Sequence, residues 1–379
     1  MVKNITTSRL CISFLGLCFL GYAGILSDTR EVLRRSFCLP KTKLGFLKLH
    51  KCASTTIQNV ILRYAHNNEL NLVLPISYGT NYLGQPDVFS VKMVENAPWH
   101  SLGYDIFAVH TRWNHEAVRS LIGESAVYVT MLRSPVDIFE SFYSYSKLDE
   151  SYNASLPDFI DKLSDRHFKL NIAEKRKYKF VGRNQMAWDF GLKPKFFEND
   201  EAIDKLIQYI DENFHLVMIA ERFEESIVLF RNLMCWEDND VTYLKLNARV
   251  DNKKMNLTNE QRSILASWLS ADMKLYKYFS KKFDQLIDGF GKKRMKKQVE
   301  ELLAKNKELE NKCVEKIVTN EELGMKEKWY SDTVYSYRIR DSPECRYYGI
   351  KENTFLNELQ AIQTARVKEK TEREKVTEN

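Results

Sequence analysis

A lysine followed by three hydroxyl residues is the first group in this sequence whose residue types and spacing could bind an anion. Lys51 lies in the run HKCASTT, which contains Ser54, Thr55 and Thr56. An apolar run at 44–49 precedes it and apolar residues at helical spacing follow it, which predicts a strand, a tight loop and a helix start. The unpaired N–H groups at a helix start attract phosphate or sulfate, and nearby hydroxyls add hydrogen bonds. The loop lacks the G-x-x-x-x-G-K-[ST] pattern of a Walker A loop. Taken alone, the run also fits an ordinary strand, turn and helix with Ser/Thr capping.

A histidine and an arginine stand at the ends of two further apolar runs. His110 ends the run 104–110, and Arg133 directly follows the run 126–132, with Ser141 further on in a predicted helix. A histidine can take the proton of an attacking hydroxyl, and the planar fork of an arginine bonds two phosphate oxygens at once. On its own, His110 equally fits a histidine that is hydrogen-bonded at the rim of the core.

These side chains meet only if the apolar runs before them lie side by side in one sheet. The runs at 44–49, 104–110, 126–132 and 214–220 are short and apolar, which is typical of buried strands, and the run 242–249 alternates like a strand. Ligands bind at the carboxyl ends of parallel strands in α/β folds. We therefore expect an α/β fold with a central parallel sheet flanked by helices.

Five stretches of the sequence resemble the Golgi galactose-3-O-sulfotransferases, a family that sulfates the 3-hydroxyl of galactose on glycolipids and glycoproteins. They lie between about residues 44 and 290 and read FLKLHKCASTTIQN, YVTMLRSPVDIFESFYSY, GRNQMAWDFGL, AERFEESIVLFRNLMCW and VTYLKLNAR. The resemblance implies a P-loop-like sulfotransferase fold that binds 3′-phosphoadenosine 5′-phosphosulfate (PAPS) and transfers its sulfuryl group to a sugar hydroxyl. No metal is expected, because no acidic pair in the sequence is convincingly placed to hold one.

The resemblance also implies roles for the residues of the first two motifs. Ser54, Thr55 and Thr56 would hold the 5′-phosphate of the donor, and Lys51 would contact its bridging oxygen. His110 would act as the catalytic base, as at the similar position of related uronyl 2-O-sulfotransferases.

Further donor and substrate contacts follow from the same resemblance. Arg133 and Ser141 would hold the 3′-phosphate of the donor, and Arg249 would lie near the donor-binding loop. Arg183 and Asn184 would bind substrate, with a capped helix start as the alternative interpretation of this pair.

The charge of the chain limits the classes of ligand. The 379 residues carry a formal net charge of +6, with 57 basic and 51 acidic residues, which suits an anionic ligand or a membrane surface but does not indicate a nucleic-acid binder. A glycosaminoglycan uronyl 2-O-sulfotransferase remains an alternative, although a polyanionic acceptor would require a longer basic groove. The non-enzyme alternative is a membrane-tethered protein whose PAPS fold has lost activity. The loop region 75–100 is a candidate acceptor site, and the oligomeric state stays open.

The N-terminal region predicts a membrane anchor. The segment 10–26 is uncharged and apolar, close to the minimum length of a spanning helix, and Lys3 and Arg9 before it favour a cytosolic N-terminus. A cleaved signal peptide is the alternative. By resemblance, we expect a single-pass type II Golgi membrane protein with a lumenal catalytic domain.

The expected organisation is a cytosolic tail (1–9), a signal anchor (10–26), a stem (27–42), the sulfotransferase domain (43–291), a helical extension packed on it (292–364) and a disordered tail (365–379).

The cysteines fit a secretory compartment. We expect a disulfide between Cys313 and Cys345, because both lie in a polar region with little core of its own, a free Cys52 in the anion-binding loop and a buried Cys235. Two Asn-x-Ser/Thr sequons on the predicted lumenal side are candidate glycosylation sites, at Asn153 and Asn256.

Overall fold

The computed structural model describes residues 38–165, 168–169, 176, 181–248, 255–319, 322–323 and 334–377. The predicted anchor at 10–26 and Arg249 lie outside these residues. Among the helices that are described, none combines the length and the apolar character needed to cross a membrane.

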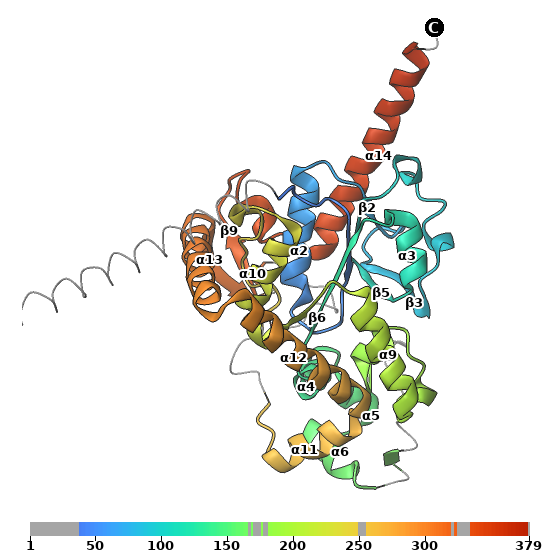
Figure 1. Cartoon of the computed structure of the whole chain (residues 1–379), viewed down its shortest axis with the longest axis vertical. Coiled ribbons are helices and arrows are strands. Elements are labelled where there is room, and N and C mark those ends of the chain that lie inside the picture. The colour runs from blue at the N-terminus through green and yellow to red at the C-terminus, as the bar shows by residue number, and fades with distance from the viewer. Residues whose placement is uncertain are drawn as a thin grey trace, which may run out of the picture.

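A five-stranded parallel sheet forms the centre of the fold (Figure 1). The strand order is β2-β4-β1-β6-β7, which puts β1 in the middle. Every residue of these strands is buried, as expected for a parallel sheet that is covered on both faces. The predicted α/β fold with a central parallel sheet is therefore confirmed, and its strands are β1 (Leu44–Leu47), β2 (Leu72–Val73), β4 (Ile106–Phe107), β6 (Val127–Leu132) and β7 (Leu216–Ile219).

Helices connect and cover the strands. Their bounds are α2 (Ser54–Asn67), α3 (His115–Ile122), α4 (Pro135–Tyr145), α5 (Leu148–Tyr152), α6 (Leu156–Lys162), α8 (Gln185–Asp189), α9 (Asp200–Asn213), α10 (Phe223–Met234), α11 (Asn259–Trp268), α12 (Ser270–Phe290), α13 (Lys292–Cys313) and α14 (Glu352–Thr377). In Figure 1, α2, α10 and α13 lie to the left of the central sheet, and α3 and α9 lie to its right. Because β1 is central and α2 follows it directly, the loop between them lies at the middle of the sheet edge.

The predicted strand at 104–110 is split between two sheets. Its first part is β4 in the main sheet, whereas its last residue begins β5 (His110–Arg112), which pairs in parallel with β3 (Tyr82–Val88). The chain leaves the main sheet between them, where the carbonyl of Ala108 accepts a hydrogen bond from Gln58 Nε2 at 2.7 Å. A side chain of α2 thus donates the hydrogen bond that the backbone of a neighbouring strand would otherwise donate to this carbonyl.

The predicted strand at 242–249 is wrong, because residues 242–248 form no strand. The backbone N–H of Leu246 donates to Thr56 Oγ1 at 3.0 Å, which ties this segment to the start of α2. At its end, the Ala248 carbonyl accepts from the Tyr335 N–H at 3.1 Å, a backbone bond to the first residue of a strand. The alternating pattern was therefore produced by a loop that packs against the anion-binding residues.

The described cysteines form two disulfides. Cys313 and Cys345 are bonded and Cys52 is free, both as predicted, and the structure shows that Cys52 is also buried. The prediction that Cys235 is simply a buried thiol is wrong, because it forms a disulfide with Cys38. Cys235 is the left-handed cap residue (φ 56°) after α10, and the chain before β1 runs past this point.

The C-terminal part contains a hairpin and a long helix. β8 (Val314–Thr319) and β9 (Tyr335–Ile339) pair in antiparallel fashion after α13. From residue 365 onward the sequence predicts disorder, but in the structure α14 continues to Thr377. Arg366 Nη1 donates to the carbonyl of Glu69 at 2.8 Å, which ties the middle of α14 to the body, while its last turns extend away from it (Figure 1).

Candidate functional site

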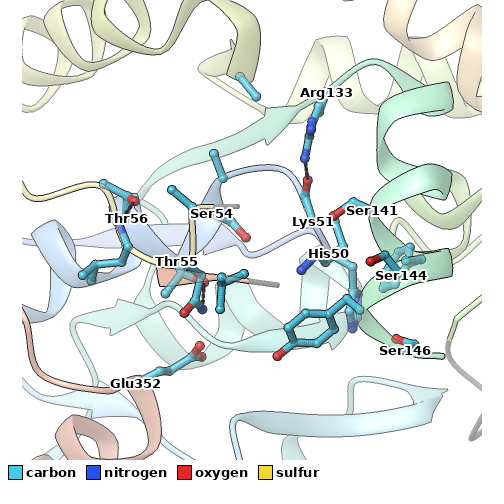
Figure 2. Close-up of a pocket in the computed structure, with 18 of the residues that line it drawn as sticks. His50, Lys51, Ser54, Thr55, Thr56, Arg133, Ser141, Ser144, Ser146 and Glu352 are labelled. Carbon is cyan, nitrogen blue, oxygen red and sulfur yellow. Dashed lines mark hydrogen bonds between the residues drawn. The ribbon is translucent and has the colours of Figure 1, made fainter. Parts of the chain in front are cut away.

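A cavity of about 1770 Å³ lies beyond the carboxyl ends of β1 and β6. The sequence places its candidate residues in three separate runs, and the structure brings these runs together around this one cavity (Figure 2). The predicted residues that line it are Lys51, Ser54, Thr55, Thr56, His110, Arg133 and Ser141.

The loop between β1 and α2 is tightly turned. Lys51 and Ala53 both have a left-handed backbone, with φ of +58° and +55°, a conformation that costs about 1–3 kcal/mol for a residue other than glycine. Ser54 Oγ donates to the carbonyl of Leu49 at 2.6 Å and so closes the turn. α2 has no side-chain cap at its N-terminus, so its first N–H groups can donate to an anion in the cavity.

Positive side chains surround this helix start. Arg133 follows β6, and its Nη1 donates to the carbonyl of Lys51 at 3.0 Å, which fixes the arginine beside the loop. The Lys51 ammonium lies 3.5 Å from the centroid of the Tyr145 ring, in a cation–π contact with α4. Ser141 lies on the same helix and on the same cavity wall. The side of the cavity at the start of α2 can therefore hold negative charge.

His110 is a buried, neutral imidazole in this cavity. Its Nδ1 donates to the carbonyl of Lys48 at 2.8 Å. Because a carbonyl can only accept, the proton of the neutral ring is on Nδ1 and the lone pair is on Nε2. Burial lowers the pKa of His110 well below 6.5, the charges of Lys48 and His50 lower it further, and the carbonyl bond partly opposes them. The ring can thus accept a proton at neutral pH.

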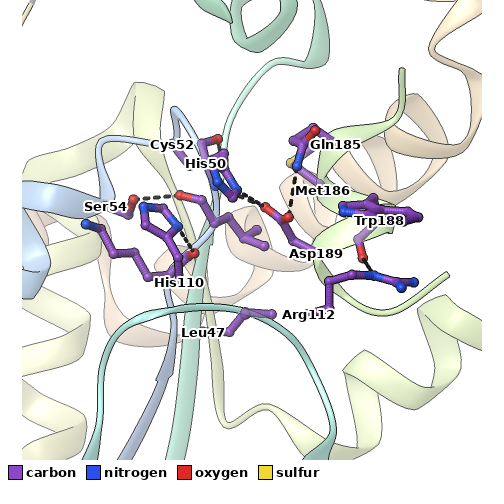
Figure 3. A network of polar contacts seen from close by, with 12 residues as sticks. Leu47, His50, Cys52, Ser54, His110, Arg112, Gln185, Met186, Trp188 and Asp189 are labelled. Atoms are coloured by element: carbon purple, nitrogen blue, oxygen red, sulfur yellow. Dashed lines mark hydrogen bonds and ion pairs between the residues drawn. The ribbon is translucent and has the colours of Figure 1, made fainter. Parts of the chain in front are cut away.

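A second histidine, which the sequence interpretation missed, stacks on His110. The ring centroids of His50 and His110 are 4.2 Å apart. His50 Nδ1 bonds to Asp189 Oδ2 at 2.8 Å, and the His50 backbone N–H donates to the same oxygen at 3.1 Å (Figure 3). Gln185 Nε2 donates to the other oxygen of Asp189 at 2.9 Å, so this fully buried carboxylate is held on both sides. The signal available in the sequence was the position of His50 directly before Lys51.

A buried ion pair that was not predicted from the sequence lies next to His110. The side chain of Lys48 is 1% exposed, and its ammonium pairs with Glu352 at the start of α14. Burial lowers the pKa of Lys48, and the charge of Glu352 and its hydrogen bond oppose this shift. Glu352 lies on the cavity wall, so a residue near the C-terminus lines the same cavity as the loop after β1.

Arg183 and Asn184, predicted to bind substrate, do not line the cavity. Arg183 Nε donates to the carbonyl of Trp268 at 2.7 Å, and Asn184 Oδ1 accepts from the backbone N–H of Asp272 at 3.1 Å. Both are buried and join the start of α8 to α11 and α12. They therefore support the helix that carries Asp189, although the Asn184 side chain does not cap the N-terminus of this helix.

The predicted donor contact Arg249 lies outside the described residues, but the chain just before it reaches the loop. Leu246 bonds to Thr56 as described above, and Asn247 Nδ2 donates to Thr55 Oγ1 at 3.4 Å. Across the described part of the chain, no group of three or more His, Cys, Asp or Glu side chains is arranged to hold a metal ion.

Comparison with known proteins gives a consistent result. The family model described as Galactose-3-O-sulfotransferase matches residues 4–328. The chain is 30% identical to galactosylceramide sulfotransferase of Mus musculus over 283 residues, which are 73% of this chain and 65% of that protein. It is 31% identical to galactose-3-O-sulfotransferase 2 of Sus scrofa over 287 residues, or 73% and 70% of the two chains. It is 32% identical to galactose-3-O-sulfotransferase 3 of Homo sapiens over 292 residues, or 74% and 65%. The matched part of the chain thus spans about two thirds of the length of these relatives.

Proposed function

Because the chain belongs to the galactose-3-O-sulfotransferase family, we propose that it transfers a sulfuryl group from PAPS to a sugar hydroxyl, the 3-hydroxyl of a galactose on a glycolipid or a glycoprotein glycan. One observation carries the proposal: an uncapped helix start, an arginine fixed beside it and a buried histidine converge on one cavity. The cavity is larger than the roughly 300–1,000 Å³ of a pocket for one small ligand. Donor and acceptor therefore have room to bind together.

The residues around the start of α2 fit the donor. The backbone N–H groups of Ser54 and Thr55 and the hydroxyls of Thr55 and Thr56 would hold the 5′-phosphate. The Ser54 hydroxyl donates to the Leu49 carbonyl and keeps the turn closed. Arg133 would bond the 3′-phosphate through its planar fork, with Ser141 as a further donor. PAPS, when bound, supplies the activated sulfuryl group, and the protein supplies position and charge.

The chain's own residues divide the work of the transfer. His110 Nε2 takes the proton of the acceptor hydroxyl, because its lone pair faces away from the Lys48 carbonyl. Lys51 and the N–H groups of α2 stabilise the negative charge that grows on the departing phosphate oxygen. His50, which Asp189 holds, packs against the His110 ring and keeps its plane fixed.

We also propose that the protein acts in the Golgi lumen as a single-pass type II membrane protein. The two disulfides support this proposal, because disulfides persist in oxidising compartments. Expression in animal cells tests it: N-glycosidase should shift the protein's mobility on a gel, and Asn153→Gln should reduce that shift. A full-length chain with no glycan at all would contradict a lumenal orientation.

The reaction itself is tested by sulfate transfer from radiolabelled PAPS with the full chain. The acceptors are a lactoside with a free galactose 3-hydroxyl, the same lactoside blocked at this oxygen, and desulfated heparan. We expect label on the free lactoside alone. Label on heparan would instead favour the uronyl 2-O-sulfotransferase alternative.

Two variants separate the proposed site from general damage. Lys51→Ala should abolish transfer, because it removes the cation beside the departing oxygen. Lys205→Ala removes an exposed lysine on α9 that pairs with Glu201, and it should leave transfer unchanged. Equal activity of Lys51→Ala and the wild type would refute the proposed site.

A further inference from the structure

The part of the cavity away from Arg133 has a different chemistry from the phosphate-binding side. In Figure 2, Glu352 lies at the opposite side of the cavity from Arg133, and its carboxylate faces the hydroxyl residues of the loop. The neighbouring wall is formed by residues 79–82 and 349–353. This wall contains one acidic side chain (Glu352), one basic side chain (Lys351) and the amides of Asn81 and Asn353. Its described residues include no arginine, and its fixed amides and carboxylate suit the hydroxyl groups of a second ligand better than a phosphate.

The first turns of α14 fix the loop that forms this wall. Asn353 Nδ2 donates to the carbonyl of Gly79, and Asn357 Oδ1 accepts from the Gly79 N–H, both at 3.0 Å. Gln360, one turn further along, bonds to the carbonyl of Pro75. Residues 353, 357 and 360 lie on one face of the helix. The helix therefore holds the loop in place by a row of amide side chains.

Only one of the two carboxylate oxygens of Glu352 is engaged in bonds to the described part of the protein. Its Oε1 pairs with the Lys48 ammonium and accepts from Asn81 Nδ2 at 2.9 Å. Its side chain is 13% exposed, and among the described residues Oε2 has no hydrogen-bond partner. A carboxylate oxygen that is fixed in place and open to the cavity is a strong acceptor for a hydroxyl group.

An aromatic ring lies beside the proposed base, on the same cavity wall. The Tyr82 ring stacks on His110, with centroids 5.2 Å apart and planes 20° apart. Tyr82 directly follows Asn81, the residue that bonds Glu352. An aromatic surface beside a few fixed polar groups suits a sugar, whose ring has an apolar C–H face and a hydroxyl edge.

We infer that Glu352, Asn81 and Tyr82 form the subsite for the acceptor sugar, and that the fixed charge of Glu352 selects a neutral, unsulfated galactoside. A sugar hydroxyl would donate to Glu352 Oε2 while the ring packs near Tyr82, beside His110. An acceptor with its own carboxylate or sulfate would be repelled here. The inference rests on the proposed function, and α14 lies beyond residues 4–328, the part that matches the family.

Binding of a lactoside to the full chain, measured by calorimetry with adenosine 3′,5′-bisphosphate present, tests this subsite without requiring turnover. Glu352→Gln should weaken lactoside binding by about tenfold or more, because a charge-assisted hydrogen bond is lost. The bisphosphate affinity should stay the same. Glu358→Gln is the matched control: it changes another α14 glutamate, one that pairs with Arg346, and it should leave lactoside binding unchanged.

A second variant distinguishes loss of the subsite from a folding defect, because Glu352→Gln alone leaves the buried Lys48 ammonium without its partner. Lys48→Met combined with Glu352→Gln removes both charges, and it should retain bisphosphate binding while losing the lactoside. A disaccharide that ends in glucuronic acid should bind the wild type more weakly than the lactoside does, and Glu352→Gln should narrow this difference.

The outcomes separate this inference from the proposed function. A wild type that binds no lactoside, or a Glu352→Gln variant that binds it as the wild type does, overturns the subsite. A wild type that binds the lactoside through Glu352 but transfers no sulfate supports the subsite and refutes the proposed reaction.

Discussion

Replacing His110 with glutamine removes the proposed base and keeps a polar side chain of similar size. Loss of a general base lowers kcat by about 10²- to 10⁴-fold, or about 3–5 kcal/mol of barrier. The affinity for adenosine 3′,5′-bisphosphate should not change, because His110 bonds to Lys48 and is not among the residues that would hold the phosphates.

The pH dependence follows from the environment of the same ring. Burial and the nearby charges of Lys48 and His50 lower the pKa of His110 well below 6.5. The neutral form that accepts a proton therefore persists below pH 6.5, and the acid limb of kcat should lie below that value. In the folded protein His110 releases its proton at a lower pH than in the unfolded chain. The contribution of the neutral His110 ring to the free energy of unfolding is therefore fully present above pH 6.5. It is lost as the pH falls through the lowered pKa that His110 has in the folded protein.

The assay is initial-rate sulfate transfer to a lactoside between pH 4.5 and 8.5, with bisphosphate binding measured in parallel. His110→Gln should give a low rate that no longer shows the acid limb of the wild type. A wild-type acid limb above pH 6.5, or a variant that keeps kcat within tenfold of the wild type, would refute the assignment of His110 as the base.

Three further predictions test other parts of the site and the fold. Arg133→Lys should weaken bisphosphate binding by about tenfold, since a lysine cannot bond two phosphate oxygens at once; calorimetry measures this, and an unchanged affinity would contradict the phosphate contact. Asp189→Asn should lower kcat and leave bisphosphate affinity intact, because Asp189 holds His50 against the base and does not line the cavity; a selective loss of donor binding would argue against this role. Replacing both Cys313 and Cys345 by serine should lower the unfolding free energy by about 3–4 kcal/mol for a loop of this length; thermal unfolding checks this, and an unchanged melting temperature would contradict it.

The parts of the fold that could be predicted from sequence are those governed by local patterns. An apolar run followed by small hydroxyl residues and helical spacing specified β1, the loop and α2. Arg133 and Ser141 were placed correctly because a buried strand and a proline-initiated helix fix their positions along the chain. The rule that ligands bind at the carboxyl ends of parallel strands then brought these separate motifs to one edge.

The parts that could not be predicted depend on partners far away in sequence. His50 and Asp189 are 139 positions apart, and nothing local to either residue indicates the other. The pairing of Lys48 with Glu352 likewise depends on where α14 returns to the sheet. The run at 242–249 misled because a loop that packs against α2 buries residues in the same way as a strand does.

The disulfide between Cys38 and Cys235 has a mechanical consequence. β1 begins at Leu44, a few residues after Cys38, and it is the middle strand on which the anion-binding loop depends. The Lys41 N–H donates to the Met234 carbonyl, and Trp236 Nε1 donates to the Lys41 carbonyl, both at 2.9 Å. A pulling force on the chain before Cys38 is therefore passed through the covalent bond to the end of α10. The load bypasses β1, so tension on the N-terminal segment leaves the register of the central strand and the shape of the loop unchanged.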